Sequence, residues 1–159
     1  LPRKFKMAFS GCPADCALST VNDLGFIAKK KVVDGEEKYG FSVFVAGGMG
    51  AHSRVADLLE DFIEVEDVPY VAEAVMRLFD KHGNRRNKHK ARLRFVMERL
   101  GYERFAGIYR DELQAVKRKG TERLGIRDLA SLKCADTTLG PIAEENNDIG
   151  FQQWLASNV

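Results

Sequence analysis

The sequence predicts an α+β domain of two layers (two-layer α/β), in which a mostly antiparallel sheet is covered by amphipathic helices. Two observations lead to this prediction. Short alternating or apolar segments, typical of strands, occupy the first third of the chain, and three stretches with helical periodicity follow them. The length of 159 residues and the 45% of hydrophobic residues suit a domain of ordinary size with one core.

The segment KFKMAF predicts the first strand, because cationic and apolar residues alternate along it. Phe5, Met7 and Phe9 would then lie on the buried face, whereas Lys4 and Lys6 would both lie on the other face. Such a lysine pair is either the solvated face of an edge strand or two cations, about 7 Å apart, that face a bound anion.

A loop and a hairpin follow the first strand. SGCPADC is predicted to be a loop because its glycine and proline break regular structure, and Asp15 can cap a short helix over ALSTVND. Residues 25–33 and 39–46 predict two strands joined by a DGEE turn. Residues 55–65 fit a short helix and a strand equally well.

The next part of the chain is predicted to be helical. Asp67 as a cap and Pro69 in the first turn begin a helix that ends at Gly83. NRRNKHKARLRFVMERLG predicts a second helix that ends at Gly101, and residues 103–119 predict a third.

The chain is expected to contain one module and the start of another. Residues 1–118 form the module, and residues 119–149, with few large apolar side chains, form a linker. Residues 150–159 are amphipathic and are interpreted as the truncated start of a next module. Because the chain begins in a predicted strand without an initiator methionine, we expect it to be a piece of a longer protein.

Composition excludes several classes of protein. No stretch approaches the roughly 18 apolar residues that cross a bilayer, and no signal-type apolar block follows the basic start, so no membrane partner is expected. The 25 basic and 23 acidic residues nearly cancel, and the net charge of +2 says little about partners. The three cysteines are an odd number, which argues against a disulfide framework and favours a reducing cytoplasm.

Cys12 and Cys16 form a CxxxC pair in the predicted loop, and their role is open on the residues alone. A zinc site or an iron–sulfur cluster needs about four ligands, so further ligands would have to come from elsewhere. The alternative is a pair of small buried thiols in a tight turn.

Six basic residues crowd the start of the second predicted helix, and three interpretations are open. The run is a solvated helix face, a nucleic-acid-binding module that uses the basic helix 85–94, or a cradle for a polycarboxylate, since a guanidinium can donate two parallel bonds to a carboxylate. The lack of interleaved aromatic residues and the near-neutral total charge argue against nucleic acid. The six are Arg85, Arg86, Lys88, Lys90, Arg92 and Arg94.

Five motifs in order, LPRKFK, SGCPADC, NDLGF, AGGMG and GNRRNKHKARLRFVMERLG, resemble the siroheme-containing nitrite and sulfite reductases over about residues 1–118. The resemblance implies one half, the first, of a pseudo-symmetric oxidoreductase whose modules hold siroheme and a 4Fe-4S cluster between them. It implies multi-electron reduction of nitrite to ammonia or of sulfite to sulfide by the whole protein. This piece is not expected to be active alone. The expected partners are the substrate anion, the remaining modules and an electron donor such as ferredoxin or a flavoprotein, in the cytoplasm.

The resemblance also implies roles for the cations. Lys4 and Lys6 would contact the substrate anion on the distal side of the siroheme, neutralise its charge and help to deliver protons. Arg92, together with Lys88 and Arg85, would bind the siroheme carboxylates.

The remaining implied contacts involve the glycines, the ND dipeptide and the cysteines. Gly47 and Gly48 resemble the glycine turn that lies against the cofactor, and Asn22 belongs to the family's ND dipeptide. Cys12 and Cys16 resemble the second cysteine pair of the cluster, which in these enzymes belongs to the second half, whereas here it follows a motif of the first half. We interpret the two cysteines as a remnant or accessory ligand pair, with the cluster bound mainly by the missing half. The alternative is a subfamily with differently arranged modules.

Overall fold

The computed structural model divides into two compact units, Leu1–Gly125 and Ile126–Val159, each considered by itself. Nearly all of the predicted linker, including Cys134, lies outside the described residues. In the second unit, α4 (Ile149–Asn158) is a helix over the segment that was predicted to begin a next module. The structure describes residues 1–33, 35–50, 52–120 and 149–158.

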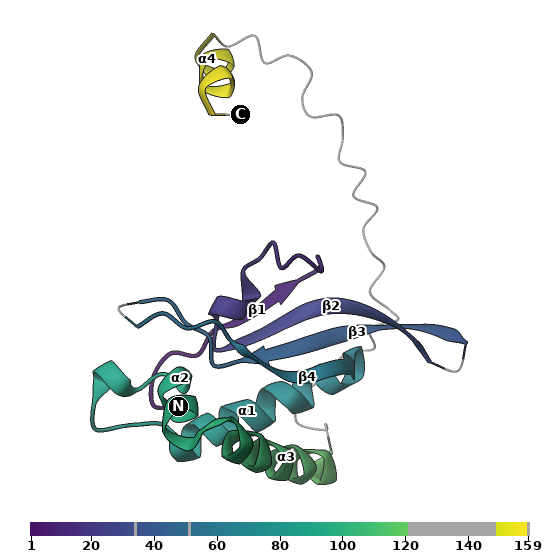
Figure 1. Cartoon of the computed structure of the whole chain (residues 1–159), viewed down its shortest axis with the longest axis vertical. Helices are drawn as coiled ribbons and strands as arrows, with labels where there is room; N and C mark the ends of the chain where they lie inside the picture. The colour runs from purple at the N-terminus through teal and green to yellow at the C-terminus, as the bar shows by residue number, and fades with distance from the viewer. Residues whose placement is uncertain (34, 51, 121–148, 159) are drawn as a thin grey trace. The chain divides into compact units, whose positions relative to one another are not determined.

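A four-stranded sheet forms one layer of the first unit. Its strands are β1 (Met7–Ser10), β2 (Leu24–Val33), β3 (Glu36–Val45) and β4 (Asp57–Glu64), and they follow this order across the sheet (Figure 1). β1 and β2 run parallel, whereas β2 pairs with β3, and β3 with β4, in antiparallel fashion. The prediction of a mostly antiparallel sheet is therefore confirmed.

Strand β4 resolves the segment that fitted a helix and a strand equally well. Its register with β3 shifts on both sides of Val43, which is typical of a β-bulge. A bulge interrupts the alternation of inward and outward side chains, and this explains why the segment lacked a clear period of two.

Three helices form the second layer: α1 (Val68–His82), α2 (Leu93–Leu100) and α3 (Tyr102–Lys119) lie on the same side of the sheet (Figure 1). As predicted, α1 is followed by Gly83 and α2 by Gly101. None of the helices in the described residues is both long and apolar enough to cross a membrane. The largest side chains of the shared core are Leu24, Phe26, Val43, Val45, Val71, Val75, Leu78, Phe79, Leu93, Phe105 and Tyr109.

The first strand differs from its prediction. β1 begins at Met7, after both lysines of the KFKMAF segment. Met7 and Phe9 are 46% and 51% exposed, so the prediction that they are buried is wrong. β1 is an edge strand at the margin of the core. Phe9 stacks on the fully buried Phe26 with ring centroids 4.6 Å apart and meets Phe41 edge-on at 5.8 Å, while half of its surface stays exposed. Phe5 does pack against the core, 6.0 Å from the ring of Phe79.

Candidate functional site

A fully buried aspartate, Asp23, joins three segments that the sequence analysis singled out. Its Oδ2 atom accepts hydrogen bonds from the main-chain N–H of Lys6 at 2.9 Å and from Nη2 of Arg92 at 2.6 Å. Nε of Arg92 donates to Oδ1 at 3.3 Å, and the main-chain carbonyl of Asp23 accepts from the N–H of Ala46 at 2.9 Å. We call Asp23, Lys6, Ala46 and Arg92 the Asp23 junction.

The segment before β1 is held by its main chain while its lysine side chains stay exposed. The N–H of Lys6 donates to Asp23, and its carbonyl accepts from the N–H of Leu24 at 3.1 Å. Among the residues that the structure describes, the ammonium groups of Lys4 and Lys6 have no hydrogen-bond or ion-pair partner. The main chain of Lys6 is thus fixed, and the charges of both lysines remain available to a ligand.

The basic residues lie mostly before α2, in residues 83–92, which we call the basic loop and which contains the short 3₁₀ helix Lys88–Lys90. The expectation that all six crowd a helix is wrong, because α2 begins at Leu93 and contains just one of them. Oδ1 of Asn84 accepts from the N–H groups of Arg86 and Asn87, each at 2.9 Å, and Oδ1 of Asn87 accepts from that of His89 at 3.0 Å. The bonds that Asn84 accepts compete with helical hydrogen bonds, whereas Asn87 caps the 3₁₀ helix Lys88–Lys90.

The three predicted siroheme cations differ in their surroundings. Arg92 is largely buried against Asp23, and Arg85 pairs with Oδ1 of Asp80 at 2.7 Å on the surface. Lys88 is exposed, and its side chain has no partner among the described residues. Its carbonyl accepts from Nη1 of Arg3 at 2.5 Å, so the basic loop lies beside the segment that carries the two lysines.

The glycine turn, residues 46–50, packs closely against the protein itself. A Cβ on Gly47 would lie 2.3 Å from the carbonyl oxygen of Thr20, and a Cβ on Gly48 would lie 2.4 Å from Nη1 of Arg94. Gly47 is therefore required by packing against main chain, whereas a Cβ on Gly48 would displace the end of the Arg94 side chain. Their contact with a cofactor stays a prediction.

Arg94 is a site residue that the sequence analysis named within the basic run but did not single out. Its side chain is 92% buried in α2 beside the glycine turn, and Nη1 donates to the carbonyl of Met49 at 3.3 Å. Its Nε has no partner in the described part of the chain. Its position between Leu93 and Phe95, in the apolar first half of α2, was the available signal.

Asn22 uses its side chain on the neighbouring turn. Nδ2 donates to the carbonyl of Leu18 at 2.9 Å, next to the short 3₁₀ helix Ser19–Val21. A direct cofactor contact by Asn22 stays a prediction.

The cysteine loop, residues 11–18, is organised by Asp15. Its carboxylate accepts hydrogen bonds from the N–H and hydroxyl groups of Ser19 and Thr20 at 2.5–3.0 Å, as a cap would, but the helix that follows is just the 3₁₀ helix Ser19–Val21, whose N-cap position is Leu18. Partial burial raises the pKa of Asp15, but these hydrogen bonds lower it by more and hold it at about 2. A hydrogen bond between the thiols lowers the pKa of Cys12 and raises that of Cys16.

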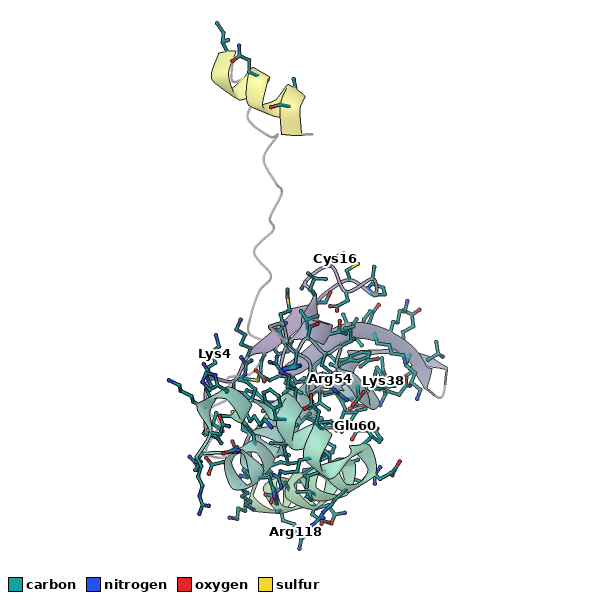
Figure 2. All side chains as sticks on the ribbon, turned by 60° about the vertical axis from the view of Figure 1, so that its left-hand side comes forward. Lys4, Cys16, Lys38, Arg54, Glu60 and Arg118 are labelled. Carbon is teal, nitrogen blue, oxygen red and sulfur yellow. The ribbon has the colours of Figure 1, made fainter. Side chains whose placement is uncertain are left out.

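The cysteine loop does not form a complete metal site. In the part of the chain that the structure describes, no group of three or more histidine, cysteine or acidic side chains could hold a metal ion. Cys16 lies on a loop that projects from the sheet, well separated from Lys4 on the surface (Figure 2). The structure therefore gathers the lysines and the basic loop around Asp23 and leaves the two thiols apart from Lys4.

A cavity of about 490 Å³ lies beside α2 and next to the basic loop. Its walls include Asn84 and Lys90 of the basic loop together with His52, His82 and Arg99. None of the residues predicted to bind the substrate, the siroheme or the cluster lines it, so the candidate site rests on the Asp23 junction.

Comparisons with known proteins point to one family. Residues 1–117 match the family model described as the nitrite and sulphite reductase 4Fe-4S domain. The assimilatory ferredoxin-dependent nitrite reductase of Haloferax mediterranei is 38% identical over 117 residues, which cover 72% of this chain and 19% of that protein. The NADPH sulfite reductase hemoprotein beta-component of Shewanella pealeana is 41% identical over 111 residues, or 66% of this chain and 19% of that protein. The chain thus spans about a fifth of the length of these relatives.

Solved structures agree with this assignment. The Mycobacterium tuberculosis NirA protein matches with a TM-score of 0.59 and 30% identity, over 75% of this chain and 20% of that chain. Dissimilatory sulfite reductase I matches with a TM-score of 0.54 over 69% of this chain and 43% of that chain. At 15% identity, the second match shows the fold alone.

Proposed function

The chain belongs to the nitrite and sulphite reductase 4Fe-4S domain family, and we propose that it is one module of a siroheme and 4Fe-4S reductase that converts nitrite to ammonia or sulfite to sulfide. One observation carries the proposal. The residues that match the family place exposed cations, including Lys4, Lys6 and Lys88, around a buried ion pair. Since the chain spans about a fifth of its relatives, the activity is proposed for the whole protein.

Lys4 and Lys6 are proposed to bind the substrate anion. Two ammonium groups would neutralise the charge of nitrite or sulfite and donate hydrogen bonds to its oxygen atoms as bonds to oxygen break. Because the main chain of Lys6 is bonded on both sides, part of the geometry is set before the anion arrives. Lysine also gives up a proton more readily than arginine does.

Siroheme, when bound, would supply the iron that carries the multi-electron reduction. The donors that the structure shows suit its carboxylates. Lys88 is free of protein partners among the described residues, and Arg92 is held by Asp23 through one edge of its guanidinium. Arg85 would have to leave its exposed partner Asp80, which costs little at the surface.

The cysteine loop fits a 4Fe-4S cluster in part. Such a cluster takes about four thiolates, and the described residues contain two, Cys12 and Cys16. We propose that the rest of the protein supplies most of the cluster ligands and that these two cysteines are an accessory pair. No step of the reaction is assigned to them.

The electron donor is proposed to be a ferredoxin or a flavoprotein, and the location the cytoplasm. One relative is named ferredoxin-dependent and another is named for NADPH, so the relatives do not favour a single donor. The relatives reported above are reductases by name and give no support to the alternative of a nucleic-acid-binding module.

The proposal is tested on the full-length protein. Purified protein should show the absorbance of siroheme, and Lys4→Ala and Lys6→Ala should each lower reduction of nitrite or sulfite about 100-fold while siroheme content is unchanged. Lys38→Ala, which removes an exposed cation paired with Glu64 on the sheet, is the control and should change neither. A colourless protein that binds RNA or DNA in a salt-dependent way would contradict the proposal.

A further inference from the structure

The proposed function gives no role to Asp23, although this residue contacts three of the segments that form the candidate site. Its carboxylate is fully buried, and its bonds reach Lys6 of the lysine segment and Arg92 of the basic loop. Its main-chain carbonyl reaches Ala46, where the glycine turn begins. Three segments with predicted ligand contacts therefore meet at one fully buried residue.

The geometry at Arg92 adds a second observation. Asp23 binds Nε and Nη2, the side-on edge of the guanidinium. Nη1 makes no hydrogen bond to any residue that the structure describes, and it is not among the buried atoms that lack a partner. One nitrogen of Arg92, with two N–H groups, thus remains accessible to an anion while the other edge is locked.

We propose, on the basis of the proposed function, that Asp23 is the positioning residue of the anion site. It orients Arg92 so that Nη1 is presented to a carboxylate of the cofactor, and it fixes the main chain from which the Lys6 ammonium group reaches the substrate anion. The buried negative charge also offsets repulsion between Arg92 and neighbouring cations, so the cationic array forms before a ligand binds.

The competing explanation is that Asp23 and Arg92 form an ion pair that serves the stability of the fold alone. Two variants of the full-length protein distinguish this explanation from the positioning role. Asp23→Glu keeps the charge but moves the carboxylate by one methylene. The double variant Asp23→Asn with Arg92→Gln replaces both buried charges by neutral amides, which avoids an uncompensated charge. Asp61→Glu is the matched control, because Asp61 pairs with Lys29 on the exposed surface.

Siroheme absorbance per chain, the affinity for nitrite or sulfite from spectral titration, and thermal unfolding are measured for each protein. Asp23→Glu and the double variant should unfold near the wild-type temperature, yet anion affinity should fall about 10- to 100-fold. Asp61→Glu should behave as wild type. Wild-type affinity in both folded variants overturns the inference, and so does a failure of both to fold, since the role of Asp23 is then structural. A wild-type protein without siroheme and without anion reduction overturns the proposed function itself.

Discussion

The Asp23 junction and the cysteine loop are both polar regions beside the sheet, but they are held together in different ways. The junction depends on contacts between residues far apart in sequence, 17 positions from Lys6 to Asp23 and 69 from Asp23 to Arg92. The cysteine loop depends on bonds from Asp15 to residues four and five positions later. A change at the junction should therefore disturb several segments, whereas a change in the loop should stay local.

Removal of one partner of the buried ion pair should give the largest effect. Arg92→Ala leaves the buried carboxylate of Asp23 without its counter-charge, and the free energy of unfolding should fall by about 3–5 kcal/mol. Denaturant unfolding of wild type and variant measures this difference.

The control for this change is an exposed ion pair. Lys38→Ala breaks a surface pair with Glu64 whose side chains are both more than 40% exposed, and should cost less than about 1 kcal/mol. Equal losses in the two variants would mean that the junction is no more important to folding than a surface pair.

Two glycine substitutions, one directly after Ala46 of the junction and one in the cysteine loop, should have effects of intermediate size and sharpen the comparison. In Gly47→Ala the new Cβ would meet the carbonyl oxygen of Thr20 at 2.3 Å, so main chain has to move and the cost should be about 1–3 kcal/mol. In Gly11→Ala, at the start of the cysteine loop, a Cβ meets nothing within 4 Å, and the change should stay within about 0.5 kcal/mol. Thermal unfolding measures the stability of both variants. A larger loss of stability for Gly11→Ala than for Gly47→Ala would contradict the packing difference between the two positions.

The contrast also explains what could be predicted from the sequence. Helix ends were placed well because Gly83 and Gly101 act locally, and Asp15 was placed correctly because its partners lie within five residues. The strand of residues 57–64 was ambiguous because a bulge interrupts its alternation. Features that depend on residues close together in sequence could therefore be predicted from the sequence.

The Asp23 junction could not be predicted in the same way. The ND dipeptide drew notice only through a family resemblance, and no spacing rule in one sequence pairs Asp23 with a residue 69 positions later. The basic run was assigned to one helix with α2 because the side-chain bonds of Asn84, which hold a turn, and of Asn87, which caps the separate 3₁₀ helix Lys88–Lys90, are not visible in a hydrophobic pattern. The prediction that Met7 and Phe9 of β1 are buried was wrong because β1 lies at the edge of the sheet, and the order of strands in the assembled sheet cannot be deduced from the pattern of one segment.

The smallest predicted effect concerns the pH dependence of the cysteine loop. Asp15 has a pKa of about 2 in the folded protein, below the value of about 3.9 expected in an unfolded chain. A carboxylate with a lowered pKa contributes stability that is present above pH 4 and is lost as the pH falls towards 2. The loop should therefore stay ordered at neutral pH and loosen between about pH 4 and pH 2.

Asp15→Ala tests this expectation, because it removes the cap and should destabilise the loop by about 0.5–2 kcal/mol at neutral pH. Hydrogen exchange at the amides of Ser19 and Thr20 reports the loop, while exchange in β2 and β3 reports the rest of the fold. Exchange at Ser19 and Thr20 should be faster in the variant than in the wild type. After correction for the intrinsic rate, protection of these amides should fall between pH 4 and pH 2 in the wild type and should not change in the variant. If exchange in β2 and β3 rises as much as exchange in the loop, the loop is coupled to the sheet, and the proposed contrast with the Asp23 junction fails.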